Sequence, residues 1–202
     1  MAVTLANILS RLASRMRENS SPDDANEKAR RISFINEGYR KICGERYWWF
    51  LKTTGTLTSV AAQETYTLPA TFRDMIEVRF DGKVYEPMDE NEAFASYTYP
   101  PSTSVGKYFV FGETELHLIP APSTVATISF RYIKYVTDLS GDSDTIIIPD
   151  LYADILPAYA YGRMKQVRGL RGSAGDGFEE YNQIAKDMLA EYNRRKFMLK
   201  NR

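Results

Sequence analysis

Residues 42–60, ICGERYWWFLKTTGTLTSV, change from one structural pattern to another within a few positions. The first part completes an amphipathic helix, and the last part alternates threonine with β-forming residues, which indicates a strand. Both tryptophans of the chain, Trp48 and Trp49, lie between Tyr47 and Phe50 at this transition. A ligand platform, a partner surface and the core of an interdomain hinge are all consistent with such a cluster.

Two helices are expected before this transition. The first has apolar residues at the three-and-four spacing of one buried helix face, namely Leu5, Ile8, Leu9, Leu12 and Met16. Ser21 as N-cap and Pro22 as the first helical residue predict the start of the second helix. This helix is expected to end near Arg46.

The middle of the chain is expected to be β-structure, because the apolar period changes to two after Lys52. Asp81-Gly82 is typical of a tight hairpin turn, and a second hairpin is predicted around residues 112–114. The number and spacing of these segments predict about six strands in a small antiparallel sandwich or barrel.

Helix is expected again from Pro149 and Asp150, with Leu151 on its inner face and Pro157 as a possible kink. Residues 170–177, LRGSAGDG, are interpreted as a flexible link. Asp176 as N-cap, with Glu179 three positions later, predicts a last helix. Its expected inner face contains Phe178, Tyr181, Ala185, Met188 and Tyr192.

This order predicts an α+β fold in which residues 1–50 and 148–202 form a helical bundle and residues 51–147 form an inserted small antiparallel β module. The aromatic segment Tyr47, Trp48, Trp49 and Phe50 is then interpreted as an interdomain hinge core, with a partner pocket as the alternative.

The composition of the 202 residues excludes several classes of protein. A single cysteine, Cys43, excludes an internal disulfide framework and an all-cysteine metal site. We expect no membrane span and no cleavable signal, and therefore intracellular synthesis and a soluble fold. Lys/Arg exceed Asp/Glu by three in residues 1–50 and by four in residues 151–202, whereas residues 51–150 have an acidic excess of seven. Such asymmetry bears on association rather than on fold.

No pattern of catalytic or metal-binding residues emerges. The only histidine, His117, is expected in mid-strand, facing solvent or an interface. Residues 171–177 lack the Gly-Lys-Ser/Thr of a phosphate loop, and the spacing of Asp138, Asp142 and Asp144 is not that of a calcium loop, so a solvated turn is favoured there. The sequence predicts a protein that is not an enzyme, with no cofactor and no metal.

The end of the chain favours an interaction role. Phe197, Met198 and Leu199 form an apolar group that follows Arg194, Arg195 and Lys196. An exposed apolar group at a terminus is typical of a surface that docks on a partner or a neighbouring subunit, whereas a frayed or self-packed end is the alternative.

Three segments together resemble the head-to-tail adaptor proteins of tailed bacteriophages, the head-completion or tail accessory factors of podovirus type. These segments are residues 34–58, FINEGYRKICGERYWWFLKTTGTLT, residues 66–87, YTLPATFRDMIEVRFDGKVYEP, and residues 148–164, IPDLYADILPAYAYGRM. The likeness covers roughly residues 30–165, with a weaker match in the last helix.

The resemblance implies a structural virion protein at the portal vertex, made in the host cytoplasm. It implies a ring, commonly of twelve subunits, that binds beneath the portal protein, extends the DNA channel and offers the attachment surface for tail or nozzle proteins. Packaged DNA would pass through without sequence-specific binding, no membrane would be involved, and residues 193–202 would reach along the portal. The alternatives are a stand-alone carbohydrate- or peptide-binding module and a cell-wall hydrolase that uses a carboxylate pair.

Overall fold

The computed structural model describes residues 2–17, 24–89, 91–93 and 106–200. The chain divides into two compact units: residues 1–50 with residues 136–202, here named the helical unit, and residues 51–135, here named the sheet unit. The mixed α+β class that the sequence predicts is therefore confirmed, whereas an inserted module with its own folding behaviour stays a prediction. Among the described helices, none has both the length and the apolar character that crossing a bilayer requires.

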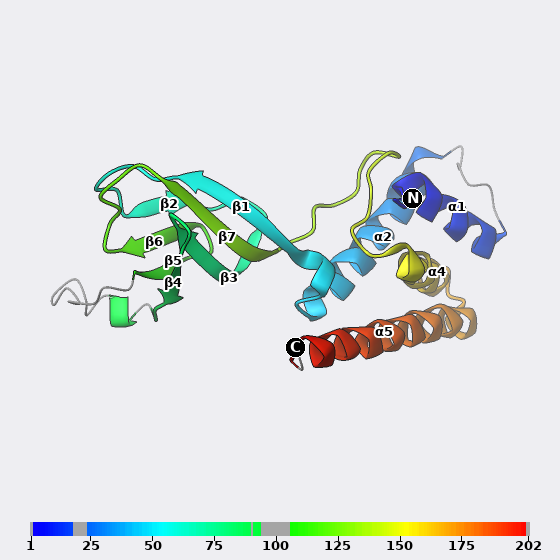
Figure 1. Ribbon diagram of the computed structural model, residues 1–202. Coiled ribbons are helices and arrows are strands. Elements are labelled where there is room, and N and C mark those ends of the chain that lie inside the picture. Colours follow the sequence, from blue (N-terminus) through cyan, green and yellow to red (C-terminus); the bar gives the residue numbers. More distant parts are fainter. Residues whose placement is uncertain (1, 18–23, 90, 94–105, 201–202) are drawn as a thin grey trace. The chain divides into compact units, whose positions relative to one another are not determined.

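The helices account for most of the helical unit (Figure 1). They are α1 Leu5–Met16, α2 Ala25–Glu45, α4 Ile155–Val167 and α5 Arg171–Lys200, with a short 3-10 turn η2 at Asp150–Tyr152. A second 3-10 turn, η1 at Trp49–Leu51, leads from the helical unit into the first strand.

The first two helices form as predicted. A capping box starts α1, in which the Asn7 N–H donates to Thr4 Oγ1 and the Thr4 N–H donates to Asn7 Oδ1. All five residues of the predicted apolar face of α1 are buried. The described part of α2 begins after Asp24, whose carboxylate accepts from the Asn26 N–H, and the predicted start at Ser21 and Pro22 lies outside the described residues.

The predicted start of the third helix is wrong. Residues 150–152 form η2 rather than α-helix, and Leu151 is 81% exposed instead of facing inward. Because α4 begins at Ile155, Pro157 lies in its first turn, where a missing N–H leaves no hydrogen bond unmade. Pro157 therefore fits within the helix without breaking it.

The interpretation of residues 170–177 as a flexible link is also wrong. Helix α5 starts at Arg171, so Asp176 and Glu179 lie inside the helix instead of capping it. A Cβ atom at Gly177 would lie 2.7 Å from the Gly162 nitrogen and 2.8 Å from the Ala158 oxygen of α4. Glycine is present here because the two helix backbones approach each other more closely than a side chain permits. Beyond this crossing, the five residues of the predicted inner face of α5 are all buried or partly buried, as expected.

The described residues of the sheet unit form seven strands in a single curled sheet (Figure 1). The strands are β1 Lys52–Thr58, β2 Thr65–Thr67, β3 Phe72–Phe80, β4 Lys83–Pro87, β5 Lys107–Phe111, β6 Glu115–Ile119 and β7 Thr127–Lys134. Their order across the sheet is β1-β7-β3-β4-β5-β6-β2.

Both predicted hairpins are confirmed. Asp81 and Gly82 have φ angles of 48° and 76° between β3 and β4, which is the left-handed pair that a two-residue hairpin turn requires. Gly112 and Glu113, at 56° and 60°, form the turn between β5 and β6.

One pair of strands differs from the expected antiparallel arrangement. Strands β4 and β5 are parallel, with Glu86 opposite Lys107 and Pro87 opposite Tyr108. A parallel pair needs a connection of a dozen or more residues, and residues 88–106 supply that length. One continuous sheet results, rather than the two sheets of a sandwich.

The sheet unit has its own apolar core on one face of the sheet. Ten buried residues form it: Tyr66, Leu68, Phe72, Val78, Tyr108, Leu116, Leu118, Ile128, Phe130 and Tyr132. The opposite face of β1, β7 and β3 carries the polar residues of the alternating pattern.

Candidate functional site

Trp48 is the largest fully buried side chain of the protein, with 1% of its surface exposed. Its Nε1–H donates to the Ile42 carbonyl oxygen at 2.6 Å, which uses a carbonyl at the free end of α2. The ring stacks on Phe50 with the centroids 6.1 Å apart, and the Tyr192 ring of α5 meets it edge-on at 5.8 Å. The tryptophan thus attaches the end of α2 to the last third of α5.

Trp49 differs from Trp48 because it is only partly buried. The Arg195 guanidinium lies over its ring, 4.7 Å from the centroid. Phe50 and Tyr152 approach the same ring edge-on, at 5.2 Å and 6.4 Å. A cation over the face of a tryptophan is the most favourable form of cation–π contact.

Glu191 holds the two arginines of this region in place. Its Oε1 accepts from Arg195 Nε at 2.7 Å, and its Oε2 accepts from Arg194 Nε at 2.8 Å. The hydrogen bond from Arg195, together with Arg194, holds the pKa of the Glu191 carboxyl below its usual value. Glu191 is therefore ionised at neutral pH and fixes the direction of both guanidinium groups.

The structure brings together the two sets of site residues predicted separately. The aromatic segment Tyr47, Trp48, Trp49 and Phe50 meets the basic residues of α5 through Arg195, whereas Arg194 contacts Glu191 of its own helix. In this cluster Tyr47 is the exception, since it is 46% exposed. That the segment acts as an interdomain hinge stays a prediction.

The side chains that the structure describes after Arg195 in α5 are exposed. Phe197 is 69% exposed, Met198 is 56% exposed, and Arg194 and Lys196 are exposed as well. The side chain of Leu199, the last residue of the predicted interface, lies outside the described part of the chain. An apolar pair beside cationic side chains therefore ends the described helix.

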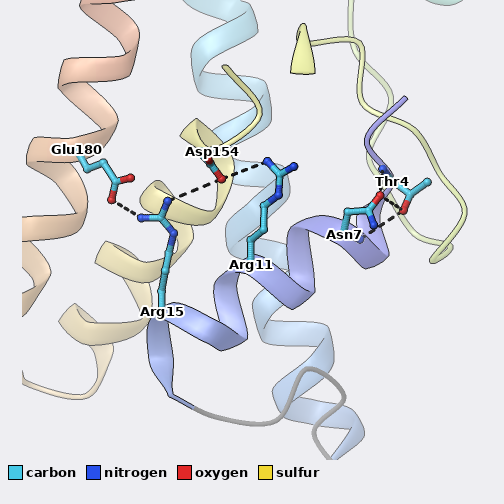
Figure 2. A network of polar contacts seen from close by, with 6 residues as sticks. All are labelled: Thr4, Asn7, Arg11, Arg15, Asp154 and Glu180. Atoms are coloured by element: carbon cyan, nitrogen blue, oxygen red, sulfur yellow. Dashed lines mark hydrogen bonds and ion pairs between the residues drawn. The ribbon is translucent and has the colours of Figure 1, made fainter. Parts of the chain in front are cut away.

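A network of ion pairs connects α1 to Asp154, just before α4, and to α5 (Figure 2). Figure 2 shows Arg11 and Arg15 pointing from α1 toward Asp154, which lies just before α4. The Nη1 of Arg11 lies 3.2 Å from Asp154 Oδ1, and Arg15 also pairs with Glu180 of α5. These carboxylates are 42–51% exposed, so each pair contributes little free energy and the network mainly sets the position of α1.

The histidine considered for chemistry, His117, is packed among other side chains of the sheet unit. His117 is opposite in direction to the buried Leu116 and Leu118, as predicted, but its side chain is only 15% exposed. Its ring stacks on Phe109 at 4.4 Å, and its Nε2 lies 3.2 Å from Glu115 Oε2. These neighbours cover most of a ring that the sequence predicts to face solvent or an interface.

The three aspartates near residue 140 each have a separate contact. Asp138 pairs with Arg40, and Asp142 lies 3.0 Å from the Lys28 Nζ. The Asp144 carboxylate accepts from the N–H groups of Ser140 and Gly141, and these two bonds lower its pKa. The side chains of Asp138 and Asp142 are 54% and 58% exposed, so the solvated turn that the sequence favours is present, and the two ion pairs link it to α2.

Sequence reasoning missed Glu191 as a site residue, and it placed Tyr192 on the inner face of the last helix without its contact to Trp48. The spacing of Glu191 and Arg195 is a signal for an i, i+4 ion pair. Nothing in the sequence pairs Arg195 with Trp49, because that contact depends on how α5 lies in the folded unit.

A family model described as SU10 adaptor protein matches residues 3–201, which is nearly the whole chain. No curated protein matches the sequence.

Proposed function

Because the chain belongs to the SU10 adaptor protein family, a family of phage head-to-tail adaptors, we propose that it forms a ring beneath the portal of a tailed-phage virion. Membership supports a structural role at the junction of head and tail and implies association with portal and tail components in the virion. The family is structural and is not known for enzymatic activity. The ring, its twelve copies and the channel through it are the proposed part.

The observation that supports a docking role is the exposed end of α5. Burying a side chain such as Phe197 or Met198 contributes roughly 1.5–3 kcal/mol each, and neither gains this in the isolated chain. Arg194 and Lys196 beside them favour a partner surface that is both acidic and apolar. We therefore assign residues 194–199 to the contact with the portal protein or a neighbouring subunit.

The cluster around Trp49 has a supporting part in this proposal. The contacts of Trp48 with Tyr192 and of Trp49 with Arg195 hold α5 against the end of α2, so the exposed end of α5 leaves the helical unit in a fixed direction. In the ring, the aromatic segment would also fix the sheet unit as a hinge core, and residues 51–147 would act as an inserted module that meets tail or nozzle proteins. Packaged DNA would pass through the channel without sequence-specific contacts.

Electron microscopy of the purified chain with the portal protein of the same phage tests the ring. We expect a new ring of density at one end of the portal, with the symmetry giving the copy number. A portal that stays bare at high excess of the chain contradicts the proposal.

The double variant Phe197→Ser/Met198→Ser tests the assignment of the α5 end. We expect it to leave the portal bare, whereas the control Leu151→Ser, at another exposed apolar residue of the helical unit, still forms the ring. If the double variant decorates the portal normally, the ring stands and the assignment of α5 is wrong.

A further inference from the structure

A hollow of about 290 Å³ lies on the polar face of β1, β7 and β3, within the sheet unit. The strand register places two rows of side chains side by side on this face. The first row is Thr54, Arg131 and Glu77, and the second is Thr56, Ser129 and Arg79. Gly55 and Phe130 line the hollow from below, since the Phe130 side chain points into the core on the other face.

The hollow is lined by two arginines and one glutamate. Glu77 is already paired, because its Oε1 accepts from Arg79 Nε at 2.6 Å. Arg131 is exposed and forms no hydrogen bond or ion pair with any other side chain in the described part of the sheet unit. Its cross-strand neighbours are Thr54 on β1 and Glu77 on β3, and the Glu77 carboxylate is the one that already accepts from Arg79. The Arg131 guanidinium can therefore pair with one further carboxylate.

The hollow adjoins an open edge of the sheet. Strand β1 pairs with β7 along its whole length, from Lys52 to Thr58, and no described strand pairs with its other side. An edge strand presents a row of backbone N–H and C=O groups to an added strand. Such a strand would lie about 4.8 Å from β1, with alternate side chains on the same face as Thr54 and Thr56. A glutamate in that strand and the long Arg131 side chain span the remaining distance across β1.

We propose that the β1 edge and this hollow bind an extended segment of another polypeptide that carries one glutamate, with its carboxylate paired to Arg131. The inference goes beyond the proposed function and does not depend on whether a ring forms or where α5 docks. Charge favours a protein segment over nucleic acid: residues 51–135 contain ten Asp/Glu and seven Lys/Arg, and Glu77 lies within the hollow itself. A single carboxylate can pair with Arg131, whereas the many negative charges of a polyphosphate would be repelled by the acidic excess of the unit.

Peptide binding to the full chain tests the proposal. The probe is a fluorescein-labelled peptide of eight residues that alternates valine and threonine and has glutamate in place of one central threonine, and the control peptide has glutamine at that position. We expect the glutamate peptide to bind at least about tenfold more tightly by fluorescence anisotropy, the factor that about 1.4 kcal/mol represents.

Two variants locate the site. Arg131→Gln is expected to remove most of that preference, and Lys83→Gln, the same change of charge on the exposed hairpin of the sheet unit, is expected to keep it. The amide NMR signals of Thr54 and Thr56 are expected to shift when the glutamate peptide is added to the unmodified chain. This measurement uses the unmodified chain, so its result does not depend on whether a variant folds.

Several results overturn the proposal. It fails if neither peptide binds, if both bind equally, or if Lys83→Gln loses as much affinity as Arg131→Gln. It also fails if a single-stranded DNA of twenty nucleotides displaces the peptide at a lower concentration than the unlabelled peptide does, since the site would then belong to nucleic acid.

Discussion

The Arg195 guanidinium of α5 lies 4.7 Å from the centroid of the Trp49 ring, so a residue in the last turns of the chain is attached to the segment that follows α2. Glu191 fixes the same guanidinium from one turn earlier on α5. The Trp49 contact thus fixes the end of the helix before the exposed pair Phe197 and Met198 begins, and the bond within α5 to Glu191 orients the guanidinium.

Replacing Arg195 by leucine is expected to loosen the end of α5 without unfolding the unit. An exposed cation–π contact contributes roughly 0.5–1 kcal/mol, so the free energy of unfolding should fall by no more than that. Hydrogen exchange of the amides at residues 193–198 should become faster. Arg194→Leu also removes a partner of Glu191 but no ring contact, so it serves as the control. Equal exchange in both variants would show that the Trp49 contact adds nothing.

Gly177→Ala is expected to destabilise the helical unit. The new Cβ would lie 2.7 Å from the Gly162 nitrogen of α4, so the helices must move apart, at a cost of roughly 1–3 kcal/mol. Gly175→Ala is the matched control on the same helix, because nothing lies within 4 Å of its Cβ position. It should stabilise α5 by about 0.5–1 kcal/mol. Urea unfolding measures both, and changes of the same sign would contradict the close crossing.

Asn36→Ala is expected to release the chain that follows the sheet unit. Asn36 is 6% exposed, its Nδ2 donates to the Leu139 oxygen at 2.9 Å, and its Oδ1 accepts from the Leu139 N–H at 2.9 Å. Removing the amide leaves two buried backbone groups without a partner, at about 1–3 kcal/mol each. Thermal unfolding should show a clear decrease in Tm. Ser33→Ala, on the exposed side of the same helix, should change Tm little.

Trp48→Ala is expected to destabilise the protein by about 3–5 kcal/mol, because it removes a fully buried ring and the hydrogen bond to Ile42. Trp48→Phe keeps most of the ring and loses the hydrogen bond, so its cost should be intermediate. Tyr47→Ala, at an exposed neighbour, should cost much less. Denaturant unfolding gives all three values, and a small effect of Trp48→Ala would contradict a structural role for the ring.

The Asp144 carboxylate is expected to make stability depend on pH in the acid range. Its pKa in the folded chain is below the ordinary value of 3.8, because the Ser140 and Gly141 N–H groups donate to it. The folded state therefore binds fewer protons than the unfolded state, and the stabilisation is present above about pH 4 and is lost as the pH falls through the folded pKa. Asp144→Asn should be less stable than the unmodified chain at pH 7, with a difference that shrinks below pH 3.8. A difference independent of pH would argue against this cause.

The features that were predicted correctly are those that neighbouring residues determine. The turn at Asp81-Gly82 needs two positive φ angles, and glycine with aspartate before it supplies them regardless of the rest of the fold. The same holds for α1, whose apolar spacing matches the buried face.

The features that were missed depend on contacts between distant segments. Glycines at 172, 175 and 177 favour a loop by local propensity, but Gly177 is in a helix because α4 packs against it. Likewise, Leu151 fits an apolar helix pattern and is nevertheless exposed, since the helix begins after it. The contact between Trp49 and Arg195 was missed for the same reason, because it joins segments that are distant in the sequence.

Lys52 faces Ile133 in the ladder between β1 and β7, directly after the chain enters the sheet unit and just before it leaves. Opposed Cα atoms of an antiparallel pair lie about 4.5–5.5 Å apart. The two ends of residues 51–135 are therefore held next to each other by this pair. The distance between these ends stays the same whether the unit has more or fewer residues. Added or deleted turns beyond this first pair leave Phe50 and Val136 undisturbed. Differences in length between members of the family are expected to gather there, while the segments on either side keep their spacing.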